Sequence, residues 1–371
     1  MQTKQAVEQI EDEVWARALD KIVKGKVVPS LRAGLGDDID MIVPQAAMAG
    51  LMSTNPGFAK MLYAAAYASA KRNAYIVTRQ VGMPADFFWK FEYWTQQRAF
   101  ETMQKVIARV FASIMSHQKQ GTLELVAADV EHVRFELTFA DCAECSCLAA
   151  GSPICYFQAG LLAGILGGLL NKDLDAVELE CAAQGSKVCK FKIGKPDDRE
   201  IKMPLEERQG HLSLHIDYSK RLEESLIRQT MGVAIRRIGD MVDVGYYQLL
   251  LSSVFLANLD VLARALLATG EEMGQASAAL ILQRFQGDVP STVSAFYRQL
   301  RYTDIRITEQ GQEVEVQAQE APETTGSMAQ AALVPFLCGG LQGILSSLMH
   351  RPLRFQSAQR DGTTLRLRFT P

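Results

Sequence analysis

Cysteine residues are the side chains of this chain with the clearest potential for chemistry. The sequence contains seven, and six of them lie between Cys142 and Cys189. A disulfide scaffold spreads its cysteines to join distant loops, whereas crowding within one segment of a long chain is typical of thiolates that share a metal ion or form a redox site. The pattern therefore indicates a metal or redox site in a reducing compartment.

Four residues have the types and the spacing of a zinc site. Cys155 opens a glycine-rich apolar segment. Glu178 and Cys181 close one expected strand and Cys189 begins the next, so a tight hairpin brings these three together. Three thiolates and one carboxylate suit tetrahedral zinc, because this ion accepts soft sulfur ligands and has no geometric preference of its own. Such a site would clamp the helix to the hairpin.

Three further cysteines precede this group in the run FADCAECSC. The Cys142-x2-Cys145 pair could replace one of the four ligands, hold a second metal or be redox-active. A single cysteine can also serve as a small buried hydrophobic residue, and for Cys147 we favour that interpretation.

Helices and antiparallel strands must position these residues. Apolar residues recur at helical spacing in some segments and alternate with polar residues in others. The predicted order, in residue numbers, is a helix at 4–23, a mainly loop segment at 26–56, long helices at 56–78 and after Pro84, a hairpin at 123–139, a glycine-rich helix at 155–171 and a second hairpin at 174–193. This order predicts the α+β fold class.

The second half of the chain repeats the first. CYFQAGLLAGILGGLLNKDL, from Cys155, aligns without a gap with VPFLCGGLQGILSSLMHRPL, from Val334, and Gly160 and Gly164 fall on glycines. Helices are expected at about 243–269 and 271–299, followed by two more hairpins. Agreement in element order and spacing favours a tandem duplication. We predict a helical extension at 1–44, a metal-binding module at 45–195, a linker and connecting helix at 196–238, and a second, degenerate module at 239–371.

The stretch PICYFQAGLLAGILGGLLNKDLDAVELECAAQGSKVCKF resembles the 4-vinyl reductase domain family. This family shares its fold with the sensory domains of aromatic-responsive regulators and with TRAPP subunits. The resemblance implies zinc at Cys155, Glu178, Cys181 and Cys189. It also implies long helices packed on an antiparallel sheet, dimerisation through helices, and a buried pocket for a small hydrophobic ligand.

The second half departs from the family pattern. The positions that align with the four ligands hold Val334, Ser357, Arg360 and about Leu365. None of these side chains is a thiolate or a carboxylate, so the second module is expected to be metal-free. The sequence thus predicts one zinc ion per chain, and either a homodimer or an internal pseudo-dimer of modules.

Aromatic and methionine residues on the long helices are candidates for the ligand pocket. Pocket and core share the same apolar chemistry, so a stripe at helical spacing is more often core. The residues we select as binding a ligand are Trp89, Tyr93, Trp94, Phe100 and Met103.

Other features narrow the functional classes. The formal net charge is −3 and no long basic run is present, which argues against nucleic-acid binding. The longest apolar stretch has about 15 residues, fewer than the roughly 20 that span a bilayer. The N-terminus is charged and lacks the apolar core of a secretory signal. We therefore expect a cytoplasmic protein, with peripheral membrane contact left open.

Redox and nucleotide motifs also bear on function. Neither a strand-linked GxGxxG nor a GxxxxGK[ST] loop is found. The lack of these motifs favours a non-catalytic protein with a structural zinc site. The family resemblance implies a hydrophobic or tetrapyrrole ligand, so our first hypothesis is that this protein binds such a ligand in chlorophyll metabolism or in assembly of a photosynthetic complex. The alternatives are a divinyl-pigment reductase or its accessory subunit, and a sensor of a small aromatic that acts through a partner.

Overall fold

The structure is a computed structural model of the 371-residue chain. It describes residues 2–22, 24, 26–55, 57–80, 95–129, 131–146, 148–198, 201, 218–255, 259–326 and 334–371. Among these residues, none of the helices combines the length and the apolar character that a bilayer crossing requires.

The first half forms an antiparallel four-stranded sheet covered by helices. Its strand order is β2-β3-β5-β4. Alternate residues of β3 are buried, as expected for a strand with one face toward the core. The elements are α1 (Gln2–Ile22), β1 (Asp38–Asp40), α2 (Ile42–Thr54), α3 (Gly57–Gln80), α4 (Gln96–Val106), the π-helical turn η2 (Ile107–Phe111), α5 (Ala112–His117), β2 (Thr122–Asp129), β3 (Arg134–Ala140), α6 (Tyr156–Leu170), β4 (Asp175–Glu180), η3 (Ala182–Gln184) and β5 (Cys189–Gly194).

The second half repeats this topology with the sheet order β7-β8-β10-β9. The α+β class with two sheet-bearing modules is therefore confirmed, while the exact module boundaries stay a prediction. The elements are α8 (Tyr218–Met231), β6 (Met241–Asp243), α9 (Val244–Phe255), α10 (Leu259–Arg284), α11 (Val289–Gln299), β7 (Asp304–Gln310), β8 (Glu313–Gln319), η4 (Pro322–Thr324), α12 (Pro335–Leu348), β9 (Arg354–Asp361) and β10 (Thr364–Thr370).

Glycines let α6 lie directly on the backbone of α3. A Cβ atom placed on Gly160 would stand 2.2 Å from the Tyr63 carbonyl oxygen, and one on Gly164 would stand 2.4 Å from that of Tyr67. Real Cβ atoms do not approach backbone this closely, so only glycine permits the contact. The Gly-x3-Gly spacing thus packs two helices within the module.

A Gly164→Ala variant should therefore unfold more easily. The added methyl group meets backbone atoms, which cannot turn aside, so we expect a loss of about 2 kcal/mol in the free energy of unfolding. Chemical denaturation measures this loss. Gly57→Ala is the matched control, because its Cβ would meet only the side chain of Asn55, at 3.0 Å. Equal stability of the two variants would contradict the close packing.

The same packing corrects one expectation for the second half. The sequence placed a helix break at residue 270, but α10 runs unbroken from Leu259 to Arg284. Gly270 lies inside it because a Cβ there would stand 2.3 Å from the Phe336 carbonyl oxygen of α12. This glycine is required by helix packing and does not mark a helix end.

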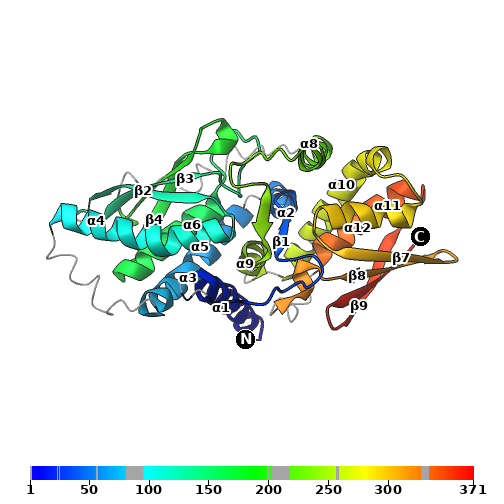
Figure 1. Cartoon of the computed structure of the whole chain (residues 1–371), viewed down its shortest axis with the longest axis horizontal. Helices are drawn as coiled ribbons and strands as arrows, with labels where there is room; N and C mark the ends of the chain where they lie inside the picture. The colour runs from blue at the N-terminus through cyan, green and yellow to red at the C-terminus, as the bar shows by residue number, and fades with distance from the viewer. Residues whose placement is uncertain are drawn as a thin grey trace.

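Each module packs a short strand and the helix that follows it against the other module. These elements are β1 and α2 from the first half, and β6 and α9 from the second. β1 pairs antiparallel with β6. The Asp40 N–H donates to the Leu300 carbonyl oxygen of the second module at 3.0 Å, and the Asp243 N–H donates to the Gln118 carbonyl oxygen of the first at 3.1 Å. α2 packs on α10 and α9 packs on α1 and α3. Figure 1 shows α2 and α9 in the middle of the molecule, between the two sheets.

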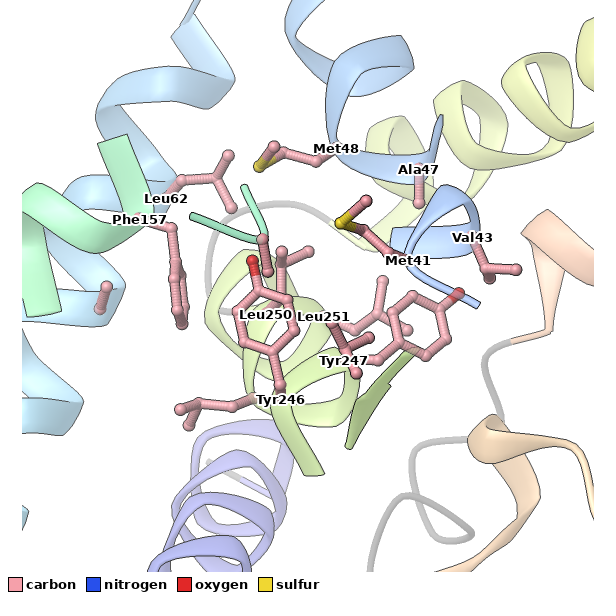
Figure 2. Packing of buried hydrophobic residues seen from close by; sticks show 14 of the residues in the cluster. Met41, Val43, Ala47, Met48, Leu62, Phe157, Tyr246, Tyr247, Leu250 and Leu251 are labelled. Carbon is pink, nitrogen blue, oxygen red and sulfur yellow. The ribbon is translucent and has the colours of Figure 1, made fainter. Parts of the chain in front are cut away.

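One hydrophobic core therefore runs through both modules. Tyr246 of α9 meets Phe157 of α6 edge-on, with ring centroids 5.9 Å apart. Figure 2 shows this region, where residues of α2 and α9 lie close to Phe157. Burial of these residues ties the start of α6 to the second module.

Candidate metal centre

The predicted zinc ligands converge on the start of α6. Cys155 is the residue that precedes this helix, Cys181 follows β4, and Cys189 begins β5. Glu178 lies within β4. All four residues are buried, and their ligand atoms lie within 4.8 Å of one another. The structure thus brings together the four residues that the sequence selected.

The distances between the sulfur atoms match a tetrahedral zinc site. Cys155 Sγ lies 3.8 Å from Cys181 Sγ and 3.7 Å from Cys189 Sγ. With Zn–S bonds of about 2.3 Å, two sulfurs of a tetrahedral site stand about 3.8 Å apart. These thiols are free, with no disulfide between them.

The Glu178 carboxylate is arranged as a metal ligand would be. Its Oε2 accepts a hydrogen bond from the Cys155 N–H at 2.8 Å. Its Oε1 is buried and has no hydrogen-bond partner among the described residues. A buried oxygen without a partner is costly, and coordination of a cation would remove that cost. The donor set therefore fits a divalent ion.

Burial also shapes the proton affinity of the site. It raises the pKa of Glu178 well above its ordinary value, and the charges of Cys181 and Cys189 raise it further. Burial likewise raises the pKa of Cys155, with a contribution from the neighbouring Cys142 thiol. A cation must displace these protons, so metal affinity falls as the pH falls.

The upstream cysteine pair belongs to the same cluster. Cys142 Sγ lies 3.8 Å from Cys155 Sγ, and Cys145 Sγ lies 3.3 Å from Cys189 Sγ. Cys142, Cys145, Cys155 and Cys189 form a second group of four buried donors within 4.8 Å of one another. Cys147 lies outside the described residues.

Two residues that the sequence did not indicate hold the cysteine loop in place. The two carboxylate oxygens of Glu144 accept hydrogen bonds from the N–H groups of Phe157 and Gln158, at 3.0 and 2.9 Å. This places a carboxylate at the N-terminus of α6, where unpaired N–H groups favour negative charge. Gln45 of α2 donates to the carbonyl oxygens of Ala143 and Ser146, at 2.8 and 2.6 Å.

The second module keeps this scaffold without the cysteines. Gln248 of α9 donates to the Pro322 carbonyl oxygen at 2.8 Å, as Gln45 does to the cysteine loop. Glu323 is buried and accepts hydrogen bonds from the hydroxyls of Tyr247 and Tyr302. Burial is the main reason that the pKa of Glu323 is raised. Burial therefore favours the protonated form of the Glu323 carboxyl.

Strand register refines the alignment of the two modules. Cys189 pairs with Phe139, and Leu365 pairs in the same way with Ala318, so Leu365 does occupy the Cys189 position. Glu178 pairs with Phe191, which lies two residues after Cys189. Leu367 lies two residues after Leu365 and is therefore the equivalent of Phe191, and it pairs with Ala358. Ala358 therefore stands at the Glu178 position, instead of Ser357, because gap-free counting cannot follow the connections between strands.

The predicted ligand-binding residues remain a prediction. Met103 of α4 is fully buried in the core, and Phe100 is partly buried against it. Trp89, Tyr93 and Trp94 lie outside the described residues.

The sheet, the glycine-bearing helix and the buried cysteines define an α+β module with a cluster of donors that could hold a metal ion. Residues 135–195 match the 4-vinyl reductase domain family, and this segment contains all four predicted ligands. The predicted resemblance is therefore confirmed for this part of the chain. No curated protein sequence shows significant similarity to the chain.

Two solved structures match the chain weakly. The phenol-responsive sensory domain of the transcription activator PoxR, determined with phenol, has a TM-score of 0.32 and 14% identity, and the match covers 45% of this chain and 78% of that one. Trafficking protein particle complex subunit 3 from Naegleria fowleri, covalently bound to palmitic acid, has a TM-score of 0.30 and 12% identity over 41% and 93%.

Proposed function

We propose that the first module is a zinc-stabilised binding module, and that the chain acts as a non-catalytic small-molecule-binding or assembly protein. The observation that carries the proposal is the buried group of Cys155, Glu178, Cys181 and Cys189 within the segment that matches the 4-vinyl reductase domain family. Three thiolates select zinc over hard cations such as magnesium or calcium.

The coordination supports a structural role for the zinc. Lewis-acid catalysis needs an open coordination position, whereas four protein donors fill a tetrahedral ion. The ligands come from the start of α6 and from both sides of the β4–β5 hairpin, so the ion would join the helix to the sheet. Metal binding would then contribute directly to the stability of the module.

The ligand in this proposal is a hydrophobic molecule, and a tetrapyrrole is its most specific form. The resemblance to the 4-vinyl reductase family motivates a role in chlorophyll metabolism or in assembly of a photosynthetic complex. The predicted contacts are Trp89, Tyr93, Trp94, Phe100 and Met103. Large aromatic side chains such as these provide the flat apolar surface that a planar ligand needs.

Tryptophan fluorescence tests ligand binding directly, because the chain has only three tryptophans, Trp15, Trp89 and Trp94. Titration of the zinc-loaded full chain with protoporphyrin IX should give saturable quenching. Quenching should persist in Trp15→Phe, which keeps the two predicted contacts as reporters. It should be much weaker in Trp89→Phe/Trp94→Phe, where only the buried Trp15 of α1 remains. No saturable change in the parent chain would refute tetrapyrrole binding.

Assays on the zinc-loaded full chain also distinguish the two alternative functions, a reductase and a sensor. Turnover of a divinyl pigment with a defined reductant would favour a reductase, and saturable binding of phenol without binding of porphyrin would favour a sensor of small aromatics.

A further inference from the structure

The six buried donors of the cysteine cluster form two overlapping groups of four. One group is Cys155, Glu178, Cys181 and Cys189, and the other is Cys142, Cys145, Cys155 and Cys189. Only Cys155 and Cys189 belong to both groups, and their sulfur atoms stand 3.7 Å apart. This shared pair has the length of one edge of a tetrahedral zinc site, about 3.8 Å.

We propose that the first module holds a binuclear centre, in which two divalent ions share the Cys155 and Cys189 thiolates as bridges. Cys181 and Glu178 complete the coordination of one ion, and Cys142 and Cys145 complete that of the other. Six donors with two bridges give four ligands to each ion. The proposal rests on the metal site of the proposed function and extends it from the expected single ion to two.

The need for a second ion follows from the position of the upstream cysteines. One ion is already saturated by four donors. Cys142 and Cys145 would then remain as buried thiols, 3.8 and 3.3 Å from the thiolates that bind that ion. A second ion would use both sulfurs as ligands. The Cys145–Cys189 pair, 3.3 Å apart, would have to widen by about 0.5 Å to fit an ideal tetrahedral edge.

The charge of the cluster also favours two ions. Five thiolates and one carboxylate carry six negative charges, of which one divalent ion neutralises two and a second ion two more. Buried charge is costly unless it is paired. The Ala182 N–H donates to Cys189 Sγ at 3.5 Å and stabilises part of the remaining charge. The buried Arg236 guanidinium donates to the carbonyl oxygen of Asp141, next to Cys142.

Metal stoichiometry tests the proposal on the full chain. The protein is stripped of metal, reloaded in a zinc-buffered solution and weighed by native mass spectrometry. We expect two zinc ions in the parent chain and one in Cys142→Ser/Cys145→Ser. The control Cys338→Ser, which changes a buried cysteine outside the cluster, should keep two. Circular dichroism identifies any variant that fails to fold.

Cadmium-113 NMR of the parent chain gives a second readout that needs no variant. A binuclear centre should show two resonances with scalar coupling between them, because the bridging sulfurs connect the two ions. Two uncoupled resonances, or a single resonance, would overturn the bridged centre.

The possible outcomes separate this inference from the proposed function. One ion in the parent chain and one in the double variant would refute the binuclear centre and leave the proposed zinc site standing. One ion that is lost in the double variant would move the site to the upstream cysteines and refute both. No ion in the parent chain would also refute both. Visible absorption with acid-labile sulfide would replace both proposals by an iron–sulfur cluster.

Discussion

Replacing Cys189 with serine should abolish metal binding and destabilise the first module by several kcal/mol. Its sulfur belongs to both groups of donors, and it is fully buried at the start of β5. Because metal binding is coupled to folding, loss of the ion removes its binding free energy from the stability of the module. The Glu178 carboxyl, whose pKa is raised by burial, would then keep its proton.

Denaturant unfolding with parallel metal analysis measures both effects. Cys338→Ser is the matched control, since Cys338 is an equally buried cysteine in α12 that touches neither donor group. The control should lose little stability and no metal. If Cys189→Ser were as stable as the control, or kept its metal, Cys189 would not be a ligand.

Replacing Arg236 with methionine should cost about 3 kcal/mol of unfolding free energy. Arg236 is buried, and its guanidinium donates to the carbonyl oxygens of Lys119, Asp141 and Met241, at 2.7, 3.3 and 2.8 Å. Removing a charged donor leaves buried carbonyl groups without a partner, and each such loss costs about 1–3 kcal/mol. The change also loosens the residue before Cys142, so a chelator should extract metal faster.

The neighbouring Arg237 provides a closely matched control. Its side chain is 82% exposed and forms an ion pair with Asp141 at 3.3 Å. Exposed ion pairs contribute about 0–1 kcal/mol, so Arg237→Met should be nearly neutral. Chemical denaturation and the rate of zinc transfer to a chromophoric chelator compare the two variants. If the two variants had the same unfolding free energy and the same rate of zinc transfer, the Arg236 contacts would not connect the modules.

The Arg236 contact has a counterpart in the other half. Arg32, just before β1, is fully buried and donates to the Arg301 and Asp38 carbonyl oxygens, both at 2.6 Å. Each arginine therefore precedes an exchanged strand and binds the end of the opposite module. This repeated arrangement follows from the duplication and makes stability of one module depend on the other.

Much of the metal site could be predicted from sequence because its ligands are marked by residue type. Thiols and a carboxylate near a hairpin turn have few other uses, so Cys155, Glu178, Cys181 and Cys189 stand out. For Cys142 and Cys145 the sequence left three roles open, because spacing alone does not give the distance between two segments.

The supporting contacts could not be predicted in the same way. Glu144 lies 13 residues from the N–H of Phe157 that it binds, and Gln45 lies 98 residues from Ala143. Hydrophobic periodicity indicates that a helix has a buried face, but it does not say which element covers that face. For this reason the exchange of α2 and α9 between modules was not foreseen. The helix break predicted at Gly270 was wrong for a related reason, because the α12 backbone against which this glycine packs is distant in sequence.

X-ray absorption at the zinc edge of the Cys142→Ser/Cys145→Ser variant, together with its elemental analysis, tests the proposed zinc site most directly. This variant isolates the donors Cys155, Glu178, Cys181 and Cys189. We expect one zinc ion per chain with three sulfur neighbours at about 2.3 Å and one oxygen neighbour at about 2.0–2.2 Å. Absence of zinc, or a zinc shell without sulfur, would contradict the proposed site.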